Sequence, residues 1–243
     1  AMTGASVLFV FSDALAKYAV QFWPIAQILA VRGFFAIALG IGAVIVAGEL
    51  TRLPHLVQRP IIVRSVIEGF TALTFLSALP LMPIADLTSI LMLSPLVITA
   101  IATLFFGETV GWRRWGAIVF GFAGMICVVQ PSGIPLTAPH YYTGAVLGLC
   151  AVMGVAMRDL LTRQLAPGIP SVVVTLGAGV GSCSAGLLLS LRDGWSEFGW
   201  IPLVCCVIAA VIVTAGNMLI VLACRGADLS LVAPYRFSSV IWA

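Results

Sequence analysis

Five charged side chains interrupt stretches of sequence that are otherwise apolar. A charge in the hydrocarbon core of a bilayer costs at least about 2.5–3.5 kcal/mol unless it is paired or faces water. Residues retained at that cost either line a pathway through the membrane or brace two helices as an ion pair. The five are Asp13, Lys17, Arg32, Glu68 and Arg236.

The first three of these charges fall at similar depths in two neighbouring stretches. Asp13 and Lys17 are four residues apart, so on a helix they share one face and can pair. Arg32 lies about seven residues into the following stretch, which is about 10 Å at 1.5 Å per residue. One interpretation is a buried ion-pair brace between the two helices. The other is an outer gate, or an anion-attracting step, created by the surplus positive charge.

Glu68 and Arg236 each fall about eight or nine residues into a stretch and are expected near the middle of a bilayer. Secondary transporters bind their substrates at that depth. Glu68 is a candidate to bind a substrate amine or carry a proton, and Arg236 to clamp a carboxylate or phosphate with two parallel hydrogen bonds. The alternative is that each only closes a salt bridge between helices.

Further candidates surround these charges. Tyr235 and Trp242 are expected to form aromatic walls for an organic ligand, and Asn217 is a buried polar candidate whose other role would be bonding between helices. Pro95 and Pro234 each remove a backbone hydrogen bond within a stretch, which is tolerated where a cavity or a neighbouring helix satisfies the carbonyls. We expect helix breaks at both prolines.

Several other chemistries are not indicated. The six cysteines have no CxxC spacing and the two histidines are isolated, so no metal site, cofactor or disulfide framework is expected. The sequence holds no phosphate-cradling loop, nucleotide motif or Ser/His/Asp set, so no catalytic residues are assigned. The net charge of +3 is small and dispersed, which argues against nucleic acid as a partner. No cleavable signal peptide is visible.

The composition is that of a protein built in lipid. Hydrophobic residues make up 61% of the chain and charged residues 9%, with a mean hydropathy of +1.16, whereas soluble domains carry about 25% charged residues. Because a bilayer-spanning helix needs about 20 apolar residues, the sequence predicts an all-α polytopic membrane protein. The predicted spans are 2–19, 25–47, 61–82, 84–106, 112–130, 142–162, 170–191, 199–222 and 227–243, the last incomplete.

One predicted span carries a face of small residues. Gly177 and Gly181 form a GxxxG step, with further glycine, serine and alanine up to residue 186. Such a face lets a neighbouring helix approach closely, so we expect packing there rather than ligand binding.

Positive residues favour one side of the expected membrane. If the first span runs outward, eight arginines fall in inner connections or near inner helix ends, against Arg192 and Lys17 outside. The positive-inside rule then places the amino terminus in the cytoplasm. We expect the membrane to be an inner membrane. The inner eight are Arg52, Arg59, Arg64, Arg113, Arg114, Arg158, Arg163 and Arg225.

A weak internal repeat divides the spans into two halves. Ala-Asp-Leu opens two spans 142 positions apart (85–87 and 227–229), and a Thr-Gly-Ala recurs at nearly the same offset. A period of five spans is odd, so the halves, expected at 1–131 and 142–243, would insert with opposite topology, as in many secondary transporters. A matching second half needs about 30 residues beyond Ala243.

Several motifs resemble a known family. Ala-Asp-Leu-Thr-Ser at 85–89, Ser-Pro at 94–95, Gly-Glu at 107–108 and Arg-Arg-Trp-Gly at 113–116 resemble the EamA domain of the drug/metabolite transporter (DMT) superfamily. The segment 232–237 resembles the ninth helix of a subgroup regarded as S-adenosylmethionine uptake transporters. The resemblance implies a ten-helix fold of two inverted five-helix EamA repeats around a central cavity, and transport by alternating access.

We therefore expect a secondary transporter of a small polar or zwitterionic metabolite, such as an amino acid or an S-adenosylmethionine-like molecule. The closest alternative is a proton-coupled exporter of amino acids or drugs. Outside transport, the alternative is a membrane-embedded enzyme acting on a lipid-linked substrate, although such enzymes usually cluster Asp or His for a metal. The expected partners are the small-molecule substrate and the lipid bilayer, and a homodimer is left open.

Overall fold

Every element in the described part of the chain is helical. The computed structural model describes residues 2–106 and 140–226, together with the single positions 112, 116 and 120. The predicted span at 227–243, and nearly all of that at 112–130, therefore lie outside the described residues. The helices are α1 (Met2–Ala19), α2 (Ile25–Val46), η1 (Leu50–Val57), α3 (Arg59–Ala78), α4 (Ile84–Leu91), α5 (Ser94–Phe106), α7 (Tyr141–Gln164), α8 (Ser171–Asp193) and α9 (Trp200–Gly226).

Six segments of the described residues are long and apolar enough to cross a membrane. They are α2, α3, the α4–α5 segment up to Ile101, α7, α8 and α9 up to Arg225. The predicted span at 2–19 folds as α1, which is not among the six and carries both Asp13 and Lys17. The described part of the chain is all-helical, as expected, and its six long apolar segments are consistent with a protein that crosses the membrane several times.

Prolines mark the starts of three described helices. Pro24, Pro83 and Pro170 each precede the first residue of a helix, where their missing N–H is not needed. Several boundaries differ from the prediction by a few residues, among them the end of α9, at Gly226 rather than at residue 222. The 3₁₀ helix η1 occupies an expected loop, and α3 ends at Ala78 rather than at residue 82.

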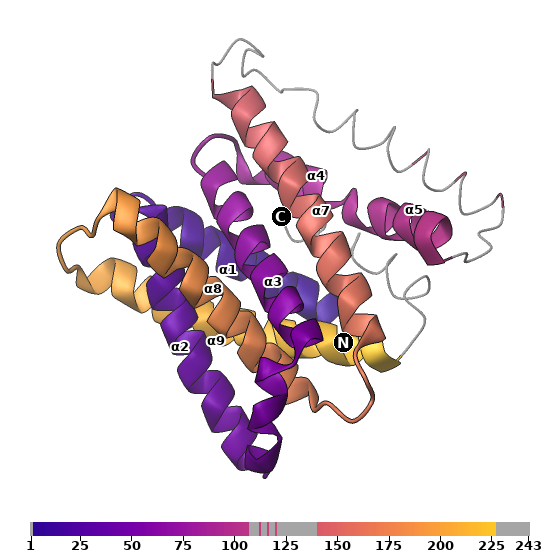
Figure 1. Ribbon diagram of the computed structural model, residues 1–243. Helices are drawn as coiled ribbons and strands as arrows, with labels where there is room; N and C mark the ends of the chain where they lie inside the picture. Colours follow the sequence, from indigo (N-terminus) through magenta and orange to yellow (C-terminus); the bar gives the residue numbers. More distant parts are fainter. Residues whose placement is uncertain (1, 107–111, 113–115, 117–119, 121–139, 227–243) are drawn as a thin grey trace.

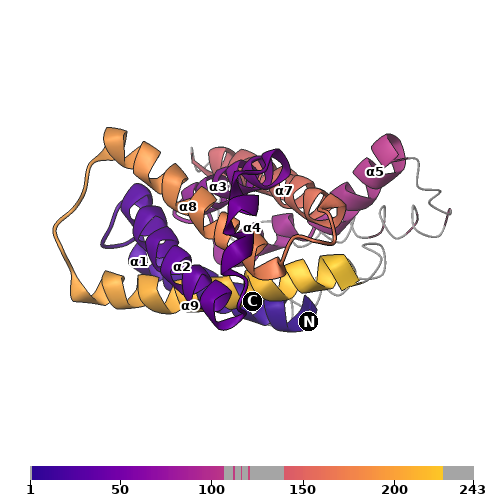
Figure 2. The same ribbon diagram turned by 60° about the horizontal axis from the view of Figure 1, so that its bottom comes forward.

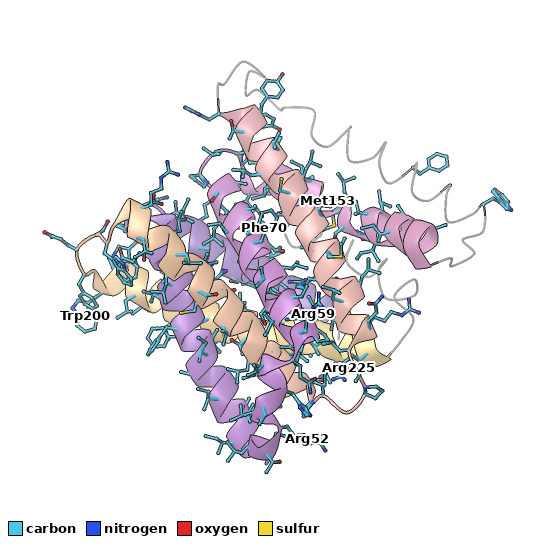
Figure 3. All side chains as sticks on the ribbon, in the orientation of Figure 1. Arg52, Arg59, Phe70, Met153, Trp200 and Arg225 are labelled. Atoms are coloured by element: carbon cyan, nitrogen blue, oxygen red, sulfur yellow. The ribbon has the colours of Figure 1, made fainter. Side chains whose placement is uncertain are left out.

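The connections α2–α3 and α7–α8 meet at one end of the bundle, which we call the arginine end. Arg52 Nη1 donates to Gly168 O at 2.6 Å, and Arg225 Nη2 donates to Ala166 O at 2.8 Å. Two arginines from α9 and η1 thus hold the α7–α8 connection. Figure 3 shows Arg52 and Arg225 on the same side of the molecule.

The connections α1–α2 and α8–α9 meet at the opposite end, which we call the tryptophan end. Trp23 Nε1 donates to Glu197 O at 3.1 Å, and Ser196 N donates to Gln27 Oε1 at 2.8 Å. Trp200 begins α9 at this end, far from Arg52 and Arg225 in Figure 3. Successive described helices on each side of the gap therefore run in alternate directions between two ends.

Helix α8 packs on both α2 and α3. Its glycines carry the contact, because a Cβ on Gly181 would collide with the Ser65 backbone of α3, and a Cβ on Gly179 would meet Ala36 of α2 at 3.3 Å. The packing role expected for the small-residue face is confirmed. The contact is antiparallel with α2, since Gly33 faces Cys183 whereas Gly179 faces Ala36.

Two further antiparallel pairs, α3 with α7 and α1 with α9, form layers on either side of the interior. Figure 2 places α3 and α7 in the upper layer and α1 and α9 in the lower one, and Figure 1 shows α7 beside α3. Buried apolar side chains pack together towards both ends: Trp23, Leu79 and Tyr141 at the tryptophan end, and Val44 and Val173 at the arginine end. A cavity remains between them.

Candidate functional site

The cavity measures about 160 Å³ and lies between the helix layers. All of the described α-helices contribute to its walls. The charged lining residues are Asp13, Arg32, Glu68 and Arg158, and aromatic rings come from Phe9 and Phe75. The remaining lining residues are Ala5, Ser6, Val10, Thr71, Ala72, Thr88, Leu91, Met92, Ser94, Ala151, Val155, Ser182, Val213 and Ile220. A space with these walls can hold a small organic molecule that carries charge.

Glu68 is the centre of a buried ion-pair network on one side of the cavity. Its Oε1 accepts a hydrogen bond from Arg158 Nη1 at 3.1 Å, which joins α3 to α7. Its Oε2 lies 3.6 Å from Arg64 Nη2, one turn earlier on α3. Arg158 Nε also donates to Asp159 Oδ1 at 3.0 Å. Two arginines and two carboxylates thus balance in charge, as a buried ionic cluster requires.

Arg64 extends the network to a third helix. Its Nε donates to Thr162 Oγ1 of α7 at 2.8 Å, and its Nη1 donates to Val174 O of α8 at 3.3 Å. Arg64 is 0% exposed and Arg158 is 5% exposed. By helical rise, Arg158 lies about 9 Å from the arginine end of α7. The network therefore ties α3, α7 and α8 together on the arginine-end side of the cavity.

Asp13 and Arg32 form a second charged pair on the cavity wall, and it is not closed. Within the residues that the structure describes, neither side chain has a hydrogen-bond partner or an ion pair within 4.0 Å, although the two attract each other electrostatically. Arg32 is nevertheless only 7% exposed. Both lie nearer the tryptophan end, Asp13 about 9 Å from the end of α1 by helical rise.

Lys17 does not pair with Asp13, in contrast to the spacing-based interpretation. Its Nζ donates instead to Met82 O at 3.2 Å, in the α3–α4 connection, and it interacts electrostatically with Asp86. The Asp86 carboxylate also accepts a hydrogen bond from Tyr141 Oη at 3.1 Å. Lys17 therefore holds the tryptophan end closed, where α1, the start of α4 and the start of α7 come together.

The predicted span at 84–106 is interrupted just before Pro95. Helix α4 ends at Leu91 and α5 begins at Ser94, so the predicted span at 84–106 is two helices with a two-residue turn. Leu91, Met92 and Ser94 all line the cavity. Irregular backbone is tolerated within a membrane protein where it borders such a cavity.

Asn217 lies on a second, much smaller cavity of about 10 Å³, between α2, α8 and α9. The Asn217 Oδ1 and Thr214 Oγ1 atoms are buried without a hydrogen-bond partner among the described residues. Arg32, Ser182 and Val213 line both cavities. The smaller one has room for about one water molecule.

Four of the sequence-predicted site residues lie outside the described residues: Pro234, Tyr235, Arg236 and Trp242. Their assigned roles stay predictions. Glu68, Asp13 and Arg32 are brought together around the larger cavity, whereas Asn217 reaches only the smaller one.

Sequence reasoning missed the partners of Glu68. Arg64 and Arg158 were counted among the inner interfacial charges, but both are buried inside helices, so they do not support the orientation. Arg64 and Glu68 are four residues apart, and this spacing, applied above only to Asp13 and Lys17, could have paired them. Asp159 carried no signal apart from its position next to Arg158.

No group of three or more His, Cys, Asp or Glu side chains suited to a metal ion occurs within the described ranges. The ionic network has only two carboxylates and each contacts arginine, although Glu68 Oε2, 3.6 Å from Arg64 Nη2, is buried without a hydrogen bond among the described residues.

Comparisons with known proteins agree with this architecture. No curated protein gives a significant match. A solved structure described as "Crystal structure of protein" is 21% identical and superposes with a TM-score of 0.73, covering 99% of this chain and 84% of that one, so the fold is shared. Residues 1–130 match the EamA-like transporter family. The chain therefore belongs to the EamA-like transporter family and is a multi-pass membrane transporter.

Proposed function

We propose that the protein is a secondary transporter that moves a small zwitterionic metabolite by alternating access across an inner membrane. The observation that carries this proposal is the cavity of about 160 Å³, which lies among membrane-crossing helices and presents charges of both signs. Phe9 and Phe75 offer apolar contact for the organic body of the solute. An amino acid or an S-adenosylmethionine-like molecule has this combination of groups.

The helix contacts support an inverted repeat formed by residues 1–131 and 142–243. If α1, α2 and α3 correspond to α7, α8 and α9, then the α3–α7 contact corresponds to α9–α1, and α3–α8 corresponds to α9–α2. All four contacts are extensive. The repeat exchanges α2 and α8, so the α2–α8 contact is its own counterpart, and it is the largest helix contact in the described bundle. Two halves related in this way can rock against each other around a central site.

The Glu68–Arg158 ion pair is the proposed lock of this motion. It joins α3 of the first half to α7 of the second, and its partners are fully satisfied only while the two helices stay in contact. Opening the arginine end would separate α3 from α7 and so break the Glu68–Arg158 ion pair. We therefore assign Glu68 to closing the cavity. An acidic group of the substrate would then bind to Arg32, or to Arg236, whose binding role is a prediction from the sequence.

The orientation follows from the two ends. Outside the buried network, the described arginines Arg52, Arg59, Arg163 and Arg225 lie at or near the arginine end, against Arg192 and Lys17 near the tryptophan end. By the positive-inside rule the arginine end, with the start of α1, faces the cytoplasm.

Uptake by the purified protein in proteoliposomes tests the function. Labelled amino acids, S-adenosylmethionine and a set of amphipathic cations are each offered with and without a pH gradient, beside protein-free liposomes. Accumulation of a zwitterionic solute supports the proposal. Movement of the cations alone, driven by the pH gradient, would indicate a drug exporter, and no movement of any solute would overturn a transport function.

A further inference from the structure

We propose that Arg32 and Asp13 form the substrate's charge-binding pair, in which Arg32 takes the carboxylate and Asp13 the ammonium of an α-amino acid. This assignment rests on the proposed transport function and deepens it. It moves the chemistry of recognition from Glu68, the midplane carboxylate, to two residues nearer the tryptophan end.

Burial without a partner is the first argument. Arg32 has five N–H donors and is 7% exposed, yet within the described chain none of them reaches a hydrogen-bond acceptor or a carboxylate. A buried cation without bonds is costly, and proteins retain such a group where a ligand supplies the bonds. The guanidinium has the planar shape that binds a carboxylate through two parallel hydrogen bonds.

The contrast with the other charges in the cavity is the second argument. Glu68 contacts two arginines, and Arg158 contacts two carboxylates. Asp13 and Arg32 attract each other but stay more than an ion-pair distance apart, so each has binding capacity that the other does not use. A molecule carrying both an anion and a cation can satisfy both groups and keep the cavity neutral.

The position of Arg32 between two cavities is the third argument. Its side chain lines the larger cavity and also the small one that contains the unbonded Asn217 Oδ1 and Thr214 Oγ1. One water molecule in the small cavity would accept a hydrogen bond from the Arg32 guanidinium and donate one to Asn217 Oδ1. Arg32 would then be held on one edge and present its other edge to the substrate.

Counterflow in proteoliposomes tests this pair, because exchange of labelled for unlabelled solute needs no coupling ion. The probe is a mixture of ¹⁴C-labelled L-amino acids, and the competitors are the same amino acids, their amides and their N-acetyl derivatives. We expect competition by the amino acids only, since the amides lack the carboxylate and the N-acetyl forms lack the ammonium.

The variants then separate the two ends of the substrate. Arg32→Gln should raise the half-saturating concentration of the amino acids by about 10- to 150-fold, the range expected for losing a charge-assisted contact, and should abolish discrimination against the amides. Asp13→Asn should likewise raise the half-saturating concentration of the amino acids, and should abolish discrimination against the N-acetyl derivatives. Arg32→Lys retains the positive charge, so its half-saturating concentration should lie between those of the wild type and Arg32→Gln. Arg192→Gln, at an exposed residue of α8, is the matched control and should behave as the wild type.

Each remaining outcome overturns the assignment. Wild-type protein that moves other solutes but exchanges no amino acid would refute this pair while leaving transport intact, whereas protein that moves nothing would refute transport itself. Variants that lose rate without losing discrimination would mark Arg32 and Asp13 as structural. If Arg32→Gln does not elute as a monodisperse protein, Arg32→Lys and the competition pattern of the wild type decide.

Discussion

Glu68→Gln is the most informative single change, because one carboxylate serves two buried arginines. The substitution keeps the shape of the side chain and removes only its charge. In the wild-type network Arg64 and Arg158 balance Glu68 and Asp159, and the two arginines repel each other. After the change one positive charge is left without a counter-charge in a site where the arginines are at most 5% exposed.

The size of the effect follows from the distances. At an effective dielectric constant of 20, the Glu68 contacts at 3.1 Å and 3.6 Å are each worth about 5 kcal/mol of Coulomb energy. Desolvation offsets much of this, and removing one partner of a buried pair costs about 3–5 kcal/mol in practice. For a chain of this size that corresponds to a fall in Tm of about 6–20 °C.

Thermal unfolding in detergent, followed by tryptophan fluorescence, measures this fall. The exposed pair Arg52–Glu49, at 3.6 Å, supplies a matched control, because Glu49→Gln should cost less than about 1 kcal/mol. A charge-balanced double variant, Glu68→Gln with Arg64→Gln, should regain part of the lost stability, with a coupling free energy of about 0.5–3 kcal/mol.

Two results would refute the reasoning. If Glu68→Gln unfolds at the wild-type temperature, the network does not carry the α3–α7 contact. If the double variant is less stable than the sum of its single changes, charge balance is not what holds Arg64 and Arg158 in place.

Three further predictions concern packing and hydrogen bonding. Gly181→Ala should destabilise by at least about 1–3 kcal/mol, because its Cβ collides with the α3 backbone, whereas Gly42→Ala, which meets nothing, should be neutral or stabilising in the same thermal assay. Thr162→Val should cost about 1–3 kcal/mol, because it leaves a buried arginine N–H unbonded, whereas Thr214→Val, whose hydroxyl has no partner in the described chain, should change Tm little. Arg225→Gln should speed proteolysis and hydrogen exchange in the α7–α8 connection without changing the helices, and unchanged exchange there would contradict its anchoring role.

The positions of the helices were predictable from apolar run length and proline. The span predicted at 25–47 is α2 at Ile25–Val46, and the span predicted at 170–191 is α8 at Ser171–Asp193. The bounds agree because each apolar run has a proline at its start and polar residues at its end. The 3₁₀ helix η1 was not predictable. Its Leu-Thr-Arg-Leu-Pro sequence has no apolar run long enough to cross a bilayer, and Pro54 argues against a helix.

The charged residues of the cavity and of the adjoining ion-pair network were only partly predictable. Hydropathy singled out Asp13, Arg32 and Glu68, because they interrupt apolar runs, and all three line the cavity. Arg64 was missed because it is the sixth residue of α3, a helix that already begins with Arg59, and a charge near a helix start is usually interpreted as lying at the membrane surface. Its burial depends on α8 covering that turn, which is tertiary information.

The partner of Glu68 is fixed by a glycine rather than by charge. A Cβ on Gly154 of α7 would collide with Thr71 of α3, so the two helices touch at this point. Because the helices are antiparallel, the numbers of two facing residues always add up to about the same value, here near 225. Moving one turn along α3 to Glu68 brings residue 157 or 158 opposite, and the observed partner is Arg158. A further turn brings Arg64 to Thr162. The small residue sets the register, and the register decides which charges meet, so Gly154→Ala should weaken the Glu68–Arg158 contact without altering either charge.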